Sequence, residues 1–126
     1  MKVPATVIAN VDTARLWGSQ SATALEHYLN TGDDSDGPPP EWQVGHFVAL
    51  YGTLTGERGT LVAVADTYPS LGDNGRLLQP ASRVAAALAR DRPGTGGVLV
   101  VVASHSVSEA EQAIQRAGLQ TVWWFN

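Results

Sequence analysis

Cysteine is absent from all 126 residues of this chain. Without it the chain has no disulfide bonds, no thiolate-bound metal site and no cysteine nucleophile of its own. The absence says nothing about compartment, so the cytoplasm is our default expectation.

Positive charge is also scarce. Eight Lys and Arg residues stand against twelve Asp and Glu residues, which gives a net charge of −4. The basic residues are scattered rather than clustered, whereas a nucleic-acid-binding face needs a basic patch. We therefore expect no nucleic-acid partner.

Long hydrophobic runs are missing as well. No segment approaches the roughly 18–20 apolar residues that a membrane span requires, and the short apolar run near the N-terminus is typical of a strand rather than a signal peptide. With 44% hydrophobic and 16% charged residues, the composition is that of a globular protein. We expect a single domain over residues 1–126, with no membrane partner.

Two apolar runs in the middle of the chain predict a β-hairpin. Residues 47–54 and 60–65 flank the turn Thr55-Gly56-Glu57-Arg58-Gly59, which has glycine near both ends. The other predicted elements are a strand at 3–9, helices at about 21–30, 80–90 and 106–118, a fully buried strand at 98–102 and a short strand at 121–125. The order predicts an α+β fold with a mixed, mainly antiparallel sheet and about three helices.

An acidic segment rich in proline and glycine, residues 31–41, interrupts these elements. Its Gly-Asp-Asp-Ser-Asp-Gly run invites comparison with a calcium loop, but it lacks the distal glutamate of an EF-hand. We interpret the segment as a solvated, mobile loop.

The candidate chemistry lies at the two ends of the hairpin stem. His46 begins the first apolar run and Asp66 follows the second, so pairing of the strands brings an imidazole near a carboxylate. Imidazole titrates near neutral pH and suits general-base catalysis, and a carboxylate can orient it. The rival interpretation is that His46 is a core histidine and Asp66 caps the turn at Tyr68-Pro69.

Other polar side chains carry weaker signals. His27 is expected on a helix surface and His105 in a loop or cap, and the spacing of His46, His105 and Asp66 is unlike that of known zinc motifs. We expect no metal and no cofactor. Ser19 and Ser21 could offer a hydroxyl nucleophile, but helix capping is the stronger interpretation because no nucleophile elbow surrounds them.

Four tryptophans stand out in so short a chain. Exposed indoles mark binding faces, so Trp17 and Trp42, together with Tyr68, are the candidate binding residues. Trp123 and Trp124 are adjacent on the predicted last strand and would point to opposite faces, which hints at a partner surface.

One stretch resembles a known family. Residues Gly45-His46-Phe47-Val48 to Gly52, then Asp66-Thr67-Tyr68-Pro69, then Gly96-Gly97 and a valine-rich strand, resemble the C-terminal half of papain-like domains of the C39 peptidase type. A longer pattern from Ala9-Asn10 to Leu78-Gln79-Pro80 resembles an uncharacterised bacterial C39-like family. The resemblance implies His46 as base and Asp66 as orienter. It also implies a cysteine-bearing segment upstream, which has no match here.

Three functions remain open. In the first, the chain is the His/Asp-bearing half of a papain-like protein that acts in acyl transfer or peptide and amide processing with a cysteine-bearing partner chain. Alternatively, it is a stand-alone acid/base enzyme (a cyclase, isomerase or lyase) acting on a peptide or small molecule, as in natural-product tailoring. The third reading is a non-catalytic module that binds a peptide or partner, and a homodimer is also open.

Overall fold

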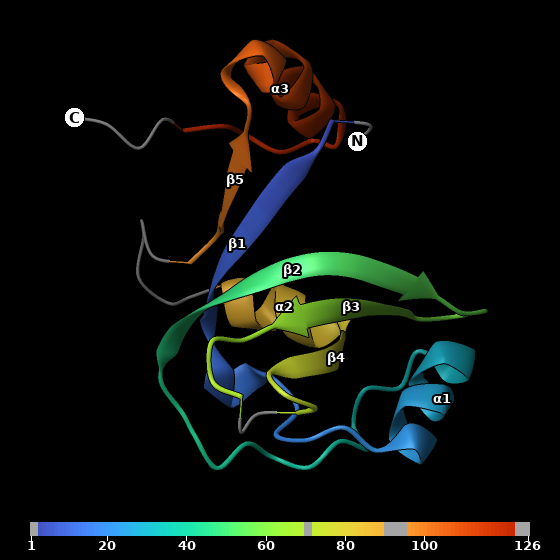
Figure 1. Ribbon diagram of the computed structural model, residues 1–126. Coiled ribbons are helices and arrows are strands. Elements are labelled where there is room, and N and C mark those ends of the chain that lie inside the picture. Colours follow the sequence, from blue (N-terminus) through green and yellow to red (C-terminus); the bar gives the residue numbers. More distant parts are fainter. Residues whose placement is uncertain (1–2, 70–71, 90–95, 123–126) are drawn as a thin grey trace. The chain divides into compact units, whose positions relative to one another are not determined.

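The computed structural model describes residues 3–69, 72–89 and 96–122 (Figure 1). The elements in chain order are β1 (Ala5–Asp12), η1 (Thr13–Arg15), α1 (Ala22–Thr31), β2 (Gly45–Thr55), β3 (Thr60–Ala65), β4 (Arg76–Pro80), α2 (Ala81–Leu88), β5 (Val98–Val102), η2 (Ser104–Ser106) and α3 (Val107–Arg116). The strands form one five-stranded antiparallel sheet in the order β4-β3-β2-β1-β5. This confirms the predicted α+β class with a largely antiparallel sheet.

The chain divides into two compact units. One comprises residues 7–99, and the other comprises residues 3–6 with 100–122. The expectation of a single domain stays a prediction.

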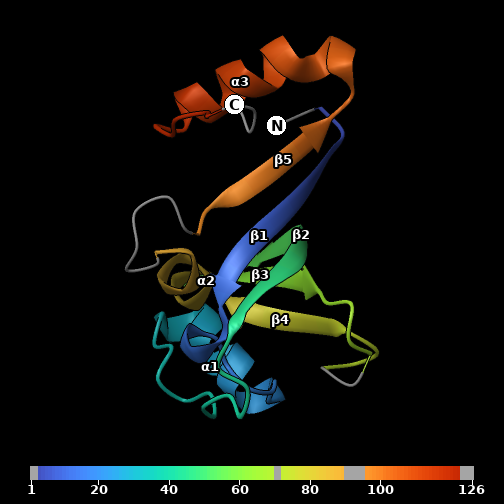
Figure 2. The same cartoon turned by 90° about the vertical axis from the view of Figure 1, so that its left-hand side faces the viewer.

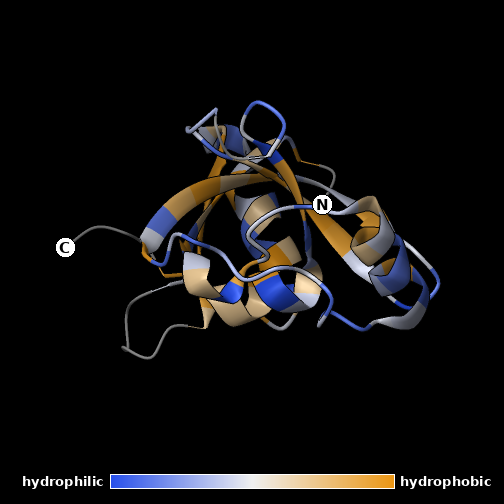
Figure 3. Ribbon diagram, turned by 90° about the horizontal axis from the view of Figure 1, so that it is seen from below, coloured by the Kyte–Doolittle hydropathy of each residue, from blue (hydrophilic) through white to orange (hydrophobic). Residues whose placement is uncertain are grey.

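The larger unit is built on the predicted hairpin. β2 and β3 pair antiparallel around the 55–60 turn, and β4 pairs antiparallel with β3 (Figure 1). Helix α2 packs against β3 and β4, as the side view shows (Figure 2). Hydrophobic colour is concentrated on the strands, while the connecting loops are mainly hydrophilic (Figure 3).

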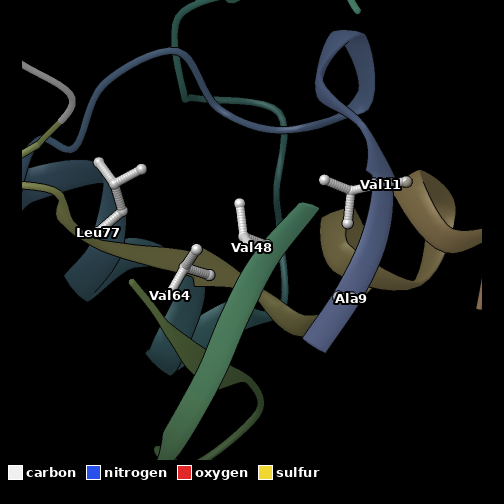
Figure 4. Close-up of a cluster of buried hydrophobic side chains, with 6 residues drawn as sticks. Ala9, Val11, Val48, Val64 and Leu77 are labelled. Carbon is white, nitrogen blue, oxygen red and sulfur yellow. The ribbon is translucent and has the colours of Figure 1, made fainter. Parts of the chain in front are cut away.

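The first apolar core lies on one face of this sheet. Alternate residues of neighbouring strands point to the same side, so their side chains pack together (Figure 4). The buried members are Ala9, Val11, Val48, Val64 and Leu77, with Ala87 added from α2. Burying a valine or leucine side chain contributes about 1.5–3 kcal/mol, so this cluster is a main source of the unit's stability.

A second core holds α1 in place. Trp17, Ala24, Tyr28 and Leu61 are its buried members. The helix begins where predicted, with the Ser21 hydroxyl accepting from the Ala24 backbone N–H, and ends at a left-handed Gly32. Ser21 is therefore a helix cap, as the stronger interpretation has it.

Strand β4 was missed from the sequence. Its five residues do not alternate cleanly, because Leu77, Gln79 and Pro80 are all buried. Gln79 is buried because its side-chain amide makes two hydrogen bonds with the backbone of Trp17: its carbonyl accepts from the Trp17 N–H and its NH₂ donates to the Trp17 carbonyl, both at 2.8 Å. A polar residue thus occupies a core position that no hydrophobic pattern reveals.

The prediction of a fully buried strand at 98–102 is wrong. β5 is the last strand in the sheet order, and Val98, Leu99 and Val101 are exposed. An edge strand has a neighbour on one side only, so an apolar run does not by itself guarantee burial.

Two predictions near the C-terminus also need correction. Glu109 and Glu111, three residues after Ser106 and Ser108, predict a capping box at the start of α3, but Ser106 caps the helix without any side-chain hydrogen bond, so the box is not formed. The helix ends as expected before a left-handed Gly118. Thr121 and Val122 are not in a strand. Trp123 and Trp124, on which a partner surface was suggested, lie outside the described residues.

The acidic segment is largely exposed, as predicted for a solvated loop, but it is anchored at Asp34. The Asp34 carbonyl accepts hydrogen bonds from the Trp17 indole and from Arg83, and the Asp34 carboxylate accepts one from Ser82 at 2.6 Å. Gly37 lies so close to the Trp17 ring that a Cβ at this position would overlap it. The segment therefore covers the second core and is anchored to α2.

Candidate functional site

His46 and Asp66 meet at one end of the β2–β3 hairpin. His46 is the second residue of β2, and Asp66 directly follows β3. The imidazole Nε2 lies 3.0 Å from each carboxylate oxygen. The two side chains are only 15% and 3% exposed, so water competes little for this contact.

A register shift within the hairpin decides that the two side chains share a face. Thr55 pairs with Thr60 beside the turn, and in that register Asp66 would pair with Ala49, on the face opposite His46. Between Leu50 and Gly52 the register shifts by one residue, which leaves Tyr51 as the extra residue of a bulge. The shift turns His46 and Asp66 to the same side as Val48 and the first core.

Asp66 also shapes the loop that follows it. Its Oδ1 accepts a hydrogen bond from the Tyr68 backbone N–H at 3.0 Å, and its own N–H donates to the Gly75 carbonyl at 2.7 Å. Gly75 has a φ of +82°, and a Cβ there would lie 2.7 Å from the Asp66 carbonyl oxygen. The turn-capping interpretation of Asp66 is thus confirmed together with its contact to His46.

The contact selects one form of the neutral imidazole. A carboxylate oxygen can only accept, so Nε2 carries the hydrogen and Nδ1 keeps its lone pair. Nδ1 has no hydrogen-bond partner among the described residues. The nitrogen available for accepting a proton is therefore Nδ1.

Two of the three candidate binding residues surround the imidazole. The Trp42 ring centroid lies 4.7 Å from that of His46, and the Tyr68 centroid lies 5.6 Å from it. Trp42 and Tyr68 also meet edge to face at 5.4 Å. Each ring is thus close to the other two, and the contacts with Trp42 and Tyr68 limit the rotation of the imidazole.

Trp17 does not belong to this group. Its side chain is 3% exposed and packs edge to face on Tyr28 in the second core. Its indole N–H is taken by the Asp34 carbonyl. Trp17 is a core residue, and its prediction as a binding residue is wrong because the acidic segment covers it.

Thr13 is the site residue that sequence reasoning missed. It is buried at the start of η1, and its hydroxyl donates to the Trp42 carbonyl at 2.6 Å and accepts from the Val44 N–H at 2.8 Å. Its partners lie 29 and 31 residues away in the chain. No local pattern connects positions so far apart, so the sequence carries no signal for this contact.

A different cluster gathers beside α1. Nitrogen and carboxylate oxygens of His27, Asp33 and Asp36 lie within 4.8 Å of one another and are exposed. The Ser35 hydroxyl, then the Ser35 N–H and then His27, hold the pKa of Asp33 below its ordinary value of 3.8. These contacts explain the cluster by hydrogen bonding within an exposed turn, and we assign no metal to it.

Comparison with known proteins adds a family. The chain matches, over residues 1–125, a family described as a family of unknown function, DUF6885. It belongs to that family. No curated protein and no solved structure matches this DUF6885 chain. Within the described parts of the chain, no helix has the length and apolar character needed to cross a membrane.

Proposed function

We propose that this DUF6885 protein supplies the base and its orienting carboxylate for acyl transfer or amide processing. The observation that carries the proposal is the contact of His46 Nε2 with both oxygens of Asp66 at 3.0 Å. This contact directs Nδ1 toward accepting a proton from a nucleophile, while Asp66 stabilises the imidazolium that forms.

The nucleophile in this proposal is a thiol from outside the 126 residues, carried by a partner chain. The resemblance to C39-type papain-like domains supports a cysteine in that role, since the same resemblance places His46 as base and Asp66 as orienter. In the reaction the thiol loses its proton to Nδ1 as sulfur bonds to the acyl carbon. The proton then passes to the leaving group as the old acyl bond breaks.

A second function is favoured by the ring contacts. Trp42 and Tyr68 enclose the imidazole with apolar surface, as a small-molecule or peptide site would. In that case His46 and Asp66 act directly on a bound substrate as a stand-alone acid/base pair, with no covalent step.

The test uses p-nitrophenyl acetate as acyl donor and N-acetylcysteamine as a thiol acceptor. The release of p-nitrophenolate is followed for the wild-type chain, for His46→Asn and for Asp66→Asn. His27→Asn is the matched control, because it removes a histidine that lies outside the site. We expect the thiol-dependent rate of the wild type and of His27→Asn to exceed that of His46→Asn by about tenfold or more.

The outcomes separate the two functions. If His46→Asn is as fast as the wild type, His46 is not a base and both proposals fail. If the wild type accelerates ester cleavage equally with and without thiol, the stand-alone function is supported instead. Loss of rate in Asp66→Asn with an unchanged fold assigns the orienting role to the carboxylate.

A further inference from the structure

Residues 42–44, which lead into His46, are held by the buried hydroxyl of Thr13. β1 and β2 pair as far as Asp12 and Gly45, where the regular ladder ends. Thr13 continues the pairing beyond that point. Its backbone N–H donates to the Val44 carbonyl at 3.0 Å, and its hydroxyl bridges the Trp42 carbonyl and the Val44 N–H.

Three hydrogen bonds from one residue thus hold the chain over residues 42–44. Thr13 is 7% exposed, and its hydroxyl both donates and accepts. Buried polar groups that are fully paired make a rigid contact, because losing either partner leaves an unpaired group away from water. The backbone of Trp42 is therefore held in one place relative to β1.

Trp42 in turn contacts the imidazole. Its ring lies 4.7 Å from His46 at an interplanar angle of 59°, on a backbone that Thr13 restrains. Asp66 restrains the same imidazole at Nε2. The ring of His46 is thus held through hydrogen bonding by Asp66 and through packing by Trp42.

We propose that Thr13 is a positioning residue for His46. Thr13 acts through Trp42 and does not itself touch any substrate. This inference rests on the proposed function, because it assigns a purpose to the orientation of Nδ1. A misplaced base transfers protons poorly, and displacements near 1 Å can cost up to about a hundredfold in rate.

The test compares Thr13→Val with Thr13→Ser in the full chain. Valine has nearly the shape of threonine but neither donates nor accepts, whereas serine keeps the hydroxyl and loses only a methyl group. Two readouts are measured: the thiol-dependent acyl transfer described above, and the rate at which diethyl pyrocarbonate modifies His46 relative to His105. His105 lies in η2 and serves as a reference within the same molecule.

We expect Thr13→Val to lower acyl transfer by roughly tenfold and to raise the His46/His105 modification ratio severalfold. The imidazole would then be less well placed and less screened by Trp42. Thr13→Ser should stay near the wild type in both. His105 is exposed and belongs to the other compact unit, so it corrects for the amount of reagent but does not report destabilisation of residues 7–99. Destabilisation is therefore measured separately by urea unfolding, and a higher modification ratio in fully folded Thr13→Val assigns the change to the position of the imidazole.

Three results overturn the inference. Wild-type values of both readouts in Thr13→Val would show that the hydroxyl positions nothing. Equal losses in Thr13→Val and Thr13→Ser would assign the effect to packing of the methyl group. Rapid amide hydrogen exchange at Val44 in the wild-type chain would show that the Thr13 hydroxyl does not hold residues 42–44. Slow exchange at Val44 supports the contact, and this measurement does not depend on the folding of Thr13→Val.

Failure of the proposed function gives a different pattern. The wild type would then transfer no acyl group faster than His46→Asn, while the modification ratio would still respond to Thr13→Val.

Discussion

The contact between His46 and Asp66 can be measured as a coupling free energy, without knowledge of any substrate. A double-mutant cycle uses His46→Ala, Asp66→Ala and the double variant. His46→Ala also removes the ring contacts with Trp42 and Tyr68, and Asp66→Ala also removes the bond from the Tyr68 N–H. These side effects cancel in the cycle, which isolates the pair itself.

The structure sets the expected magnitude. A hydrogen bond to a charged group contributes about 1.5–3 kcal/mol when it is shielded from water. Asp66 is almost fully buried but His46 keeps 15% of its side chain exposed, so the lower part of that range applies. We expect a coupling of about 1.5–2 kcal/mol in the free energy of unfolding at pH 7. Urea unfolding followed by circular dichroism measures it, since tryptophan fluorescence would respond to Trp42 as well.

The exposed pair of His27 and Asp33 is the matched control. Its Nε2–Oδ2 distance is 3.3 Å, but both side chains are more than 40% exposed. Exposed ion pairs are screened by solvent, so the same cycle should give a clearly smaller coupling there. A His46–Asp66 coupling no larger than that of the control would refute the claim that this is a shielded, oriented contact.

Two further outcomes follow from the remaining hydrogen bonds. Gln79→Leu leaves the buried N–H and C=O of Trp17 without partners, at about 1–3 kcal/mol each, so urea unfolding should show a loss of roughly 2–6 kcal/mol. The exposed Gln20→Leu is its control and should cost about 1 kcal/mol or less, and equal losses in the two would contradict the argument. Ser35→Ala should raise the pKa of Asp33 toward 3.8 in a carbon-13 NMR titration of its carboxyl. Because the pKa is lowered by folding, the stabilisation exists above pH 3.8 and is lost as the pH falls through the folded value. An unchanged pKa in Ser35→Ala, which keeps the Ser35 N–H, would exclude the Ser35 hydroxyl as the main cause.

The hairpin shows how far local patterns reach. A five-residue turn between two apolar runs predicts antiparallel pairing, and that pairing brings the start of one strand near the end of the other. Strand β3 begins and ends where predicted, and His46 and Asp66 are in contact. Whether they act in catalysis stays a prediction.

Contacts between positions far apart in the chain could not be predicted from local patterns. Gln79 reaches Trp17 across 62 residues, and Thr13 reaches Trp42 across 29. A polar side chain in the core or beneath a loop carries no periodic signal, because its burial depends on one partner rather than on a repeated pattern. The same reason explains why Trp17 was mistaken for a binding residue: its cover comes from the acidic segment.

The sequence by itself determined the α+β class, the hairpin and the pairing of a histidine with an acid at its open end, because strand pairing over a short turn is a local property. Only the tertiary structure decided that His46 and Asp66 share a face. That outcome depends on the single extra residue at Tyr51, since a shift of one residue turns a side chain from one face of a sheet to the other. The tertiary structure also decided which aromatic rings surround the imidazole, because Trp42 is held there by Thr13 at the start of η1 while Trp17 is buried elsewhere.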